Sequence, residues 1–161
     1  MSSLAWKKPD LGVYDNIELR GLLDSLTDAN VEEFLEEQIP AISPRASGRE
    51  MLYRMISERK LAYLVWRNAP QGIVTYLDAL LGFASGKSAK ATKVSEMAGQ
   101  GGLYAVSPDT RVLPLLLWMM RNAVPMVAVF EGDDFVGIFT TAGVFERLIR
   151  SAKEVRKAVA R

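Results

Sequence analysis

The stretches LAYLVWRNAPQGIVT at residues 61–75 and PMVAVFEGDDFVGIFT at residues 125–140 decide the fold of this chain. Each is an apolar run, a short polar turn and a second apolar run that ends in Thr. Two apolar runs joined by so short a turn predict a pair of antiparallel strands. The second stretch begins 64 residues after the first and has one extra residue in its turn, where an insertion costs least. The chain therefore contains one structural unit twice.

The match between the two copies continues toward the N-terminus at the same shift. Ile42-Ser43-Pro44 corresponds to Val106-Ser107-Pro108, and Met55 corresponds to Met119. Apolar spacing predicts helices over 49–60 and 112–122, strands over 61–66, 72–76, 126–130 and 135–140, and closing helices over 77–83 and 144–161. The predicted order is strand, helix, strand, strand, helix, twice. Because each unit has too few strands to bury its own sheet, we expect the two sheets to stack.

The repeat divides the chain into five parts. These are an N-terminal extension with a short helix (1–26), a first copy (27–83), a linker (84–93), a second copy (94–148) and a C-terminal basic helix (149–161). The linker is rich in Gly, Ser, Ala and Lys, a composition typical of flexible connections.

Composition excludes several classes of function. A net charge of +1, from 20 basic and 19 acidic residues, gives no global attraction for nucleic acid. Zero Cys and zero His exclude disulfides, thiolate metal sites and a histidine base. No nucleophile stands with a base and an orienting group, and no metal-binding motif is present. The sequence therefore predicts a protein that is not an enzyme and requires no metal or cofactor.

One segment has nearly the length of a membrane span, since residues 112–130 are mostly apolar. Arg121 and Asn122 near its middle, with Pro114 and Pro125 inside it, disfavour a bilayer helix. The segment instead predicts a buried helix, a turn and a strand. The first nine residues contain no apolar stretch of signal-peptide length, so we expect a cytoplasmic protein without a membrane span.

A set of short motifs, in the same order in both copies, resembles tandem CBS domains, which are named for cystathionine β-synthase. The motifs are VEEF (31–34), IPAISP (39–44) and GIVTYLD (72–78) in the first copy, and VSEM (94–97), VSPD (106–109) and GIFTT (137–141) in the second. The resemblance covers residues 27–148. It implies an α+β fold in which two CBS motifs, each β-α-β-β-α, pack as a pseudo-twofold CBS pair.

The resemblance also implies a function. CBS pairs bind adenosyl ligands such as AMP, ADP, ATP or S-adenosylmethionine in clefts between the motifs, and act as regulatory sensors of a ligand or of energy state. The family commonly forms homodimers, and a regulated partner protein is implied but not identified. Two alternatives stay open, a ligand-free interaction scaffold and a nucleic-acid binder that uses the basic C-terminal helix.

Asp78 carries the most specific site prediction. In the family pattern, an Asp three residues after the Thr of the Gly-apolar-x-Thr strand binds the ribose hydroxyls, and Thr75 and Asp78 match that spacing. A carboxylate accepts two hydroxyl donors at once, although Asp is also favoured as a helix cap. The other positions that the resemblance places in this first cleft are Ile39, Pro40, Ala62 and Tyr63, the last by stacking on a base.

The second copy departs from the pattern, because Gly143 stands where Asp78 would repeat. Glycine accepts nothing from a ribose, so three expectations stay open for the second cleft: it is empty, it binds more weakly, or a neighbour such as Thr141 takes the place of the aspartate. Thr75 and Thr140 end their strands beside a helix start, where phosphate binds well. The second cleft would be lined by Leu103, Tyr104, Pro125, Met126, Thr140 and Thr141. The phosphate candidates are Arg45, Arg111 and Lys87.

Overall fold

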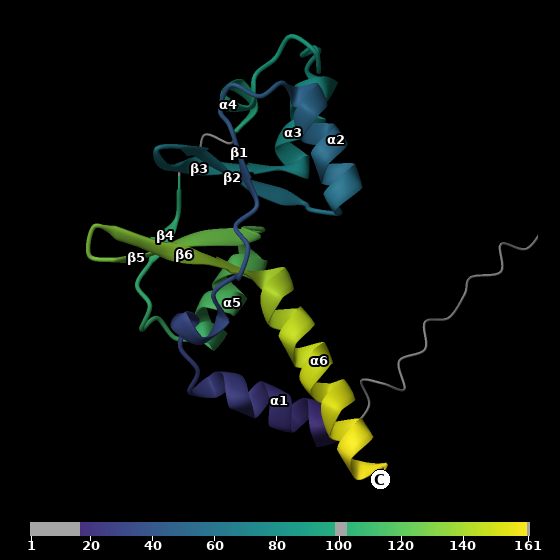
Figure 1. Cartoon of the computed structure of the whole chain (residues 1–161), viewed down its shortest axis with the longest axis vertical. Helices are drawn as coiled ribbons and strands as arrows, with labels where there is room; N and C mark the ends of the chain where they lie inside the picture. The colour runs from purple at the N-terminus through teal and green to yellow at the C-terminus, as the bar shows by residue number, and fades with distance from the viewer. Residues whose placement is uncertain (1–16, 99–102, 161) are drawn as a thin grey trace, which may run out of the picture.

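The computed structural model describes residues 17–98 and 103–160, which form two α+β units stacked on each other (Figure 1). The elements in order are α1 (Ile17–Thr27), the 3-10 helix η1 (Val31–Phe34), β1 (Ala41–Ile42), α2 (Gly48–Glu58), β2 (Ala62–Arg67), β3 (Ala69–Thr75), α3 (Tyr76–Ala84), α4 (Val94–Met97), β4 (Ala105–Val106), α5 (Val112–Arg121), β5 (Met126–Glu131), β6 (Asp134–Thr140) and α6 (Thr141–Val159). The predicted order, strand, helix, strand, strand, helix, occurs twice.

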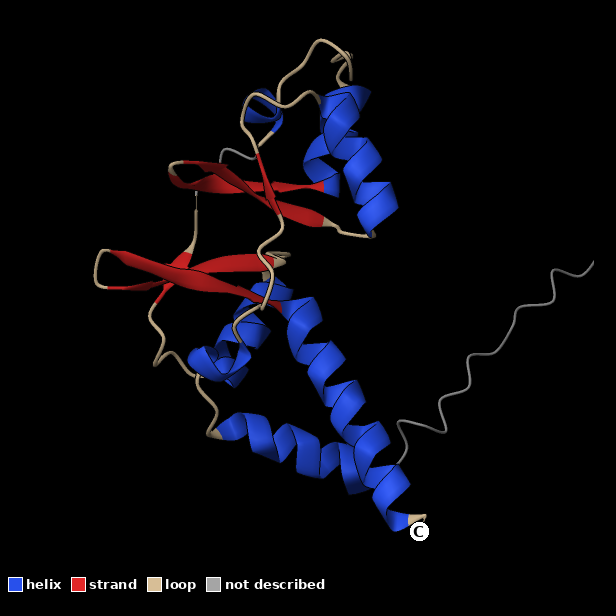
Figure 2. Cartoon of the chain, in the orientation of Figure 1, coloured by secondary structure: helices blue, strands red, loops and turns tan. Residues whose placement is uncertain are grey.

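Each copy has a three-stranded sheet, in the order β1-β2-β3 and β4-β5-β6 (Figure 2). The first pair in each sheet is parallel and the second is antiparallel, as the short turns predict. Register repeats at the 64-residue shift, with Ala41 opposite Leu64 in one sheet and Ala105 opposite Ala128 in the other. The repeat seen in the sequence is therefore a repeat of backbone pairing.

The hairpin turns explain the extra residue of the second copy. Arg67 pairs with Ala69 across the first turn, whereas Glu131 pairs with Asp134 across the second, so the insertion lies within the turn. Asn68 in the first turn and Gly132 in the second have left-handed φ values of 65° and 63°. Asn and Gly are the residues that adopt this conformation at least cost.

The two sheets lie face to face, with helices α2 and α3 outside the first and α5 and α6 outside the second (Figure 1). Between the sheets is a small core of buried residues: Ala62, Leu64, Met126 and Ile138. Separate buried clusters join each sheet to its own helices. Each sheet thus buries both faces, which neither copy achieves alone.

The copies also exchange short helices. Val31 N–H, in η1, donates to the Thr110 carbonyl of the second copy at 2.9 Å, and Val31 is buried in that copy's core. In the same way, Val94 N–H, in α4, donates to the Ala46 carbonyl of the first copy at 2.8 Å, and Val94 is buried there. Each copy as a spatial unit is therefore completed by a segment from the other half of the sequence.

The chain then crosses from η1 back to β1 through residues 35–40, which we call the crossing segment. It follows the outer edge of β6, where the backbone N–H of Glu36 donates to the Ile138 carbonyl at 3.0 Å. The Pro40 carbonyl accepts a hydrogen bond from Leu64 N–H at 2.8 Å in the other sheet. The crossing segment thus spans both sheets.

The ends of the chain pack on the second copy. Helix α1 contacts α5 and α6, and its Leu26 is fully buried. The basic C-terminal region is a continuation of α6, which begins at Thr141 and runs past the sheets to α1 (Figure 1). Residues 1–16 of the predicted extension and Arg161 of the predicted helix lie outside the described residues.

Several predicted boundaries need correction. Strand β3 begins at Ala69 rather than at the predicted Gly72, because Asn68 alone separates the two paired strands. Tyr76 begins α3 rather than ending the strand, because the Thr75 side chain caps that helix. Helix α6 likewise starts three residues before the predicted Val144. The apolar stretch 112–130 forms α5, a turn and β5, as predicted. Among the described residues, no helix combines the length and apolar character that a bilayer crossing needs.

Candidate functional site

Two pockets lie between the copies. The pocket that we call the Thr75 pocket has a volume of about 260 Å³ and is lined by Leu61, Thr75, Tyr76, Leu77, Met119, Met120, Ala123, Val124, Pro125 and Thr141. The Glu36 pocket has a volume of about 190 Å³ and is lined by Phe34, Leu35, Glu36, Glu37, Gln38, Lys60, Gly143, Glu146, Arg147 and Arg150. Each combines a strand–helix junction of one copy with a helix–strand turn of the other.

The Thr75 pocket is largely apolar and is bordered by the start of α3. Thr75 and Asp78 form a capping box, in which the backbone N–H and the hydroxyl of Thr75 donate to Asp78 Oδ2 at 2.7 and 3.0 Å. The backbone N–H of Asp78 donates in return to Thr75 Oγ1 at 3.3 Å. The helix-capping role that Asp favours is therefore realised. Asp78 itself is half-buried and lies one residue beyond the pocket-lining Leu77.

The structure separates the other positions predicted for the first cleft. Ala62 pairs with Thr75 across the sheet, but its side chain lies in the core between the sheets. Tyr63 points to the opposite face and is 0% exposed within the core of the first copy, so no ring face is open to a base. Ile39 and Pro40 lie on the crossing segment and line neither pocket.

The Tyr63 hydroxyl has a structural partner. It donates to Glu58 Oε2 at 2.7 Å, and Glu58 Oε1 accepts from Arg54 Nε at 2.9 Å. Arg54 also donates to the Ala41 carbonyl at 2.9 Å and lies 4.8 Å above the Tyr63 ring. The hydrogen bond from Arg54 lowers the pKa of Glu58, and burial raises the pKa of Tyr63. This network ties β1, α2 and β2 together.

The residues predicted for the second cleft are also divided. Pro125 and Thr141 line the Thr75 pocket, so they face the strand end of the first copy. Met126 lies in the core between the sheets and Leu103 packs against that core. Tyr104 makes an edge contact with Trp118, with ring centroids 5.0 Å apart. Thr140 donates its hydroxyl to Glu36 of the crossing segment.

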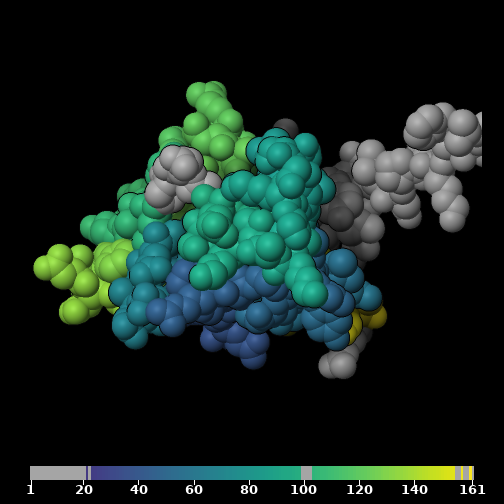
Figure 3. Space-filling view, turned by 90° about the horizontal axis from the view of Figure 1, so that it is seen from above, coloured from purple at the N-terminus to yellow at the C-terminus, as the bar shows by residue number. Residues whose placement is uncertain are grey.

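The predicted phosphate candidates lie away from both pockets. Arg111 donates to Asp28 Oδ1 at 3.0 Å and to the Thr27 carbonyl at 3.3 Å, which fixes the end of α1. Lys87 donates to the Glu96 carbonyl of α4 at 2.6 Å, which ties the linker to that helix on the surface of the first copy (teal in Figure 3). Arg45 is exposed. None of these three cations lines a pocket.

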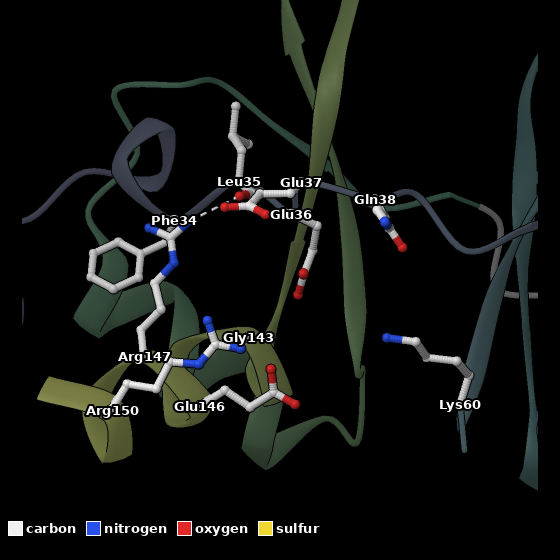
Figure 4. Close-up of a pocket in the computed structure, with 10 residues that line it drawn as sticks. All are labelled: Phe34, Leu35, Glu36, Glu37, Gln38, Lys60, Gly143, Glu146, Arg147 and Arg150. Carbon is white, nitrogen blue, oxygen red and sulfur yellow. Dashed lines mark hydrogen bonds between the residues drawn. The ribbon is translucent and has the colours of Figure 1, made fainter. Parts of the chain in front are cut away.

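Sequence reasoning missed the charged residues that do line a pocket. Lys60 and Arg150 extend into the Glu36 pocket from opposite sides (Figure 4). Lys60 belongs to the turn between α2 and β2, and the 64-residue shift places it over Val124, which lines the Thr75 pocket. The repeat therefore contained a signal for this position. Arg150 lies on the third turn of α6, where the sequence indicates only a basic face.

No family model matches the sequence, and no curated protein matches it. Solved structures are nevertheless similar. The CBS domain of the bacterial CNNM/CorC family Mg²⁺ transporter, solved in complex with ATP, has a TM-score of 0.66 and 21% identity, over 82% of this chain and 95% of that chain. The hexameric CBS-CP12 protein from bloom-forming cyanobacteria has a TM-score of 0.60 and 19% identity, over 81% of this chain and 86% of that chain.

Hypoxic Response Protein I, solved with two coordinated zinc ions, has a TM-score of 0.59 and 17% identity, over 73% of this chain and 98% of that chain. The present chain has no Cys or His, and its described residues contain no group of three or more potential metal-ligating side chains. The shared feature of these proteins is the architecture. The chain thus has the fold of a CBS-domain pair, as its motifs predict.

Proposed function

We propose that this chain is a non-catalytic regulatory module that binds an adenosyl ligand, such as AMP, ADP, ATP or S-adenosylmethionine, in the Thr75 pocket. The observation that carries the proposal is the Thr75–Asp78 capping box at the edge of a mostly apolar pocket. Apolar walls suit a purine ring. A half-buried carboxylate beside them suits the vicinal hydroxyls of a ribose.

Asp78 has capacity for both roles. Its Oδ2 atom accepts the two hydrogen bonds from Thr75. Among the described residues, its Oδ1 atom has no hydrogen-bond donor. An ionised carboxylate accepts through both oxygens, so capping of α3 leaves Oδ1 for a ligand hydroxyl. The ATP complex of the CorC CBS domain supports the ligand class.

The pocket walls suggest how binding would be transmitted. Leu61, Thr75 and Leu77 come from the first copy, whereas Met119 and Pro125 come from the second. A ligand that contacts both copies favours one relative arrangement of the two, and it shifts an equilibrium only by its differential affinity for the two arrangements. We infer that occupancy is passed to a partner protein through this arrangement.

Asp78→Asn tests the proposal. Asparagine keeps a carbonyl oxygen that accepts from Thr75 N–H, whereas Asp78→Ala would also remove the cap, at about 1 kcal/mol. A nucleotide at a hundredfold excess over Kd stabilises the wild-type protein by about 2.7 kcal/mol, a rise in Tm of roughly 5–10 °C for a chain of this size. We expect Asp78→Asn to lose most of that rise in a thermal-shift panel of AMP, ATP and S-adenosylmethionine.

The matched control is Asp133→Asn, in the exposed turn between β5 and β6. It removes the same charge and should leave the Tm rise intact. An equal rise in wild type and Asp78→Asn contradicts the assignment of Asp78. If no ligand raises the Tm of the wild-type protein, the ligand-free scaffold is the better description.

A homodimer is part of the proposal. Large apolar side chains are exposed on the outer helices, among them Ile56 on α2 at 78% and Leu81 on α3 at 70%. The two helices contact each other, so these side chains belong to one helical layer. Exposed apolar side chains gathered on one layer favour an interaction site, and a second copy of the chain is the occupant that we propose. The hexameric state of the CBS-CP12 protein shows that this fold assembles.

We expect wild-type protein to have the mass of a dimer in light scattering coupled to gel filtration. The double variant Ile56→Glu/Leu81→Glu should have the mass of a monomer, with a circular dichroism spectrum like that of the wild type. Charges at these exposed positions disrupt an interface without entering the core. If the double variant has the mass of a dimer, the dimer contact does not use α2 and α3. If the wild-type protein has the mass of a monomer, the proposed homodimer is refuted.

A further inference from the structure

Gly143 leaves the second copy without a local counterpart of Asp78, but Glu36 brings a carboxylate to the same place. Glu36 reaches in from the crossing segment, and its Oε1 accepts the hydroxyl hydrogen of Thr140. A Cβ atom built on Gly143 would overlap that same carboxylate oxygen and lie 3.1 Å from Glu36 Cδ. The Glu36 carboxylate therefore occupies the space next to Gly143 where the side chain of an aspartate would begin.

Two of the hydrogen bonds around this carboxylate repeat those of the first copy, whereas the bond from Thr75 N–H to Asp78 Oδ2 has no counterpart at Glu36 among the described residues. The backbone N–H of Gly143 donates to Thr140 Oγ1 at 2.9 Å, as that of Asp78 donates to Thr75 Oγ1 at 3.3 Å. The threonine hydroxyl in turn donates to a carboxylate in both copies. The difference is the origin of the acid, which is local in one copy and 104 residues away in the other.

Glu36 is held by its neighbours on the crossing segment. Its backbone N–H bonds to the Ile138 carbonyl at 3.0 Å, and the Leu35 side chain packs over Gly137. Arg147 donates to the carbonyls of Glu33 and Leu35 and lies 5.3 Å from the Phe34 ring centre. These contacts, at residue 36 and at the three residues before it, hold the backbone that carries the carboxylate before any ligand arrives.

The surroundings of this carboxylate differ from those of Asp78. Lys60 and Arg150 extend into the Glu36 pocket (Figure 4), whereas no cation lines the Thr75 pocket among the described residues. Neither cation forms an ion pair with another described residue. Glu37, Glu146 and Arg147 also line this pocket, so it presents three carboxylates and three cations. Lys60 and Arg150, placed beside the Glu36 carboxylate without a described ion-pair partner, suit a ligand that carries both hydroxyls and an anionic group.

We propose that Glu36 is the counterpart of Asp78 in the second copy, and that it gives the Glu36 pocket the carboxylate needed to bind the ribose of a phosphorylated nucleoside. This inference rests on the proposed function for its ligand class. It corrects the expectation that the Gly143 copy lacks an acid. It also makes the crossing segment part of a binding site.

The proposal that Glu36 takes the place of an aspartate at position 143 is tested first without ligand. The test is a mutant cycle of Glu36→Ala, Gly143→Asp and the double variant. Gly143→Asp alone places two carboxylates in one space, so we expect the Tm to fall by at least about 4 °C. In the double variant the new aspartate accepts from Thr140 as Asp78 does from Thr75, so the Tm should recover most of that loss. Such recovery is the non-additivity that direct coupling requires.

Glu37→Ala is the matched control, since Glu37 lines the same pocket one residue away. Combined with Gly143→Asp, it should give no recovery. If the losses in the Glu36→Ala cycle simply add, or if Glu37→Ala recovers the Tm equally well, the inference is overturned. The mutant cycle can be interpreted whether or not any nucleotide binds, because it is measured without ligand.

The binding arm is a calorimetric titration with AMP and ATP in an Asp78→Asn background. We expect the remaining site to lose at least about tenfold in affinity on Glu36→Ala, and to regain it when Gly143→Asp is added. Unchanged affinity on Glu36→Ala overturns the ligand role of Glu36. Absence of binding to the wild-type protein would instead refute the proposed function, and the mutant cycle would then decide the structural replacement alone.

Discussion

Leu64→Ala is expected to lower the free energy of unfolding by about 3 kcal/mol, as truncation of a fully buried leucine does. Leu64 is 0% exposed and belongs to the small core between the two sheets. The cavity would open where the copies meet rather than inside one of them. Urea unfolding followed by circular dichroism measures the change. Because both sheets share this core, we expect a single transition that moves to lower urea.

Val136→Thr is the control for that variant. Val136 lies on β6 of the facing sheet and is 40% exposed, and threonine keeps the β-branched shape. Val136→Thr should change the free energy of unfolding by no more than about 0.5 kcal/mol. Two separate transitions in Leu64→Ala, or a loss no larger than that of the control, would contradict a shared core.

Gly48→Val is expected to have the second large effect on the free energy of unfolding. It introduces valine, the residue that occupies the equivalent position of the second copy, Val112. A Cβ at Gly48 would lie 2.8 Å from Met97 Cε and 3.2 Å from the Ala89 carbonyl oxygen. The end of Met97 is able to move, but the backbone of the linker is less free to do so. Overpacking of this kind costs about 1–3 kcal/mol, measurable by the same urea titration.

Gly72→Ala is the matched control, because a Cβ at Gly72 meets nothing within 4 Å. It should be neutral or slightly stabilising, since alanine restricts the unfolded chain. Adding Met97→Ala to Gly48→Val should reduce the apparent clash and make the two losses less than additive. Full additivity, or equal losses in Gly48→Val and Gly72→Ala, would show that α4 and the linker are not tightly packed on α2.

The fold could be predicted because its determinants are local and occur twice. The apolar runs at 61–66 and 126–130 and the short turns after them specify antiparallel pairs, and the 64-residue shift specifies two equal units. Stacking follows from the small size of each sheet. Ala62 and Met126, taken for ligand contacts, lie in the core that this stacking creates.

The site was harder to predict, because each pocket is formed across the two copies. Thr75 pairs with Ala62 and lines a pocket with Pro125 of the other copy. Tyr63, the next residue on β2, points into the core of its own copy. Glu36 lies in an aperiodic segment whose path depends on contacts with β6. The sequence clue to Glu36 was Gly143, since a glycine where a helix cap is expected leaves room for another side chain.

The exchange of η1 and α4 has a consequence for how the protein is assembled. Val31 closes the core of the second copy and Val94 closes that of the first, so a cut within the linker yields two fragments that each carry a part the other needs. We expect neither fragment to bury its hydrophobic core by itself, whereas mixing the two would supply both missing parts. Folding therefore depends on contacts between distant stretches of sequence, which slow the search for the native state. Protein synthesis must proceed past Met97 before the first copy is complete, and past Leu148 before the second is complete.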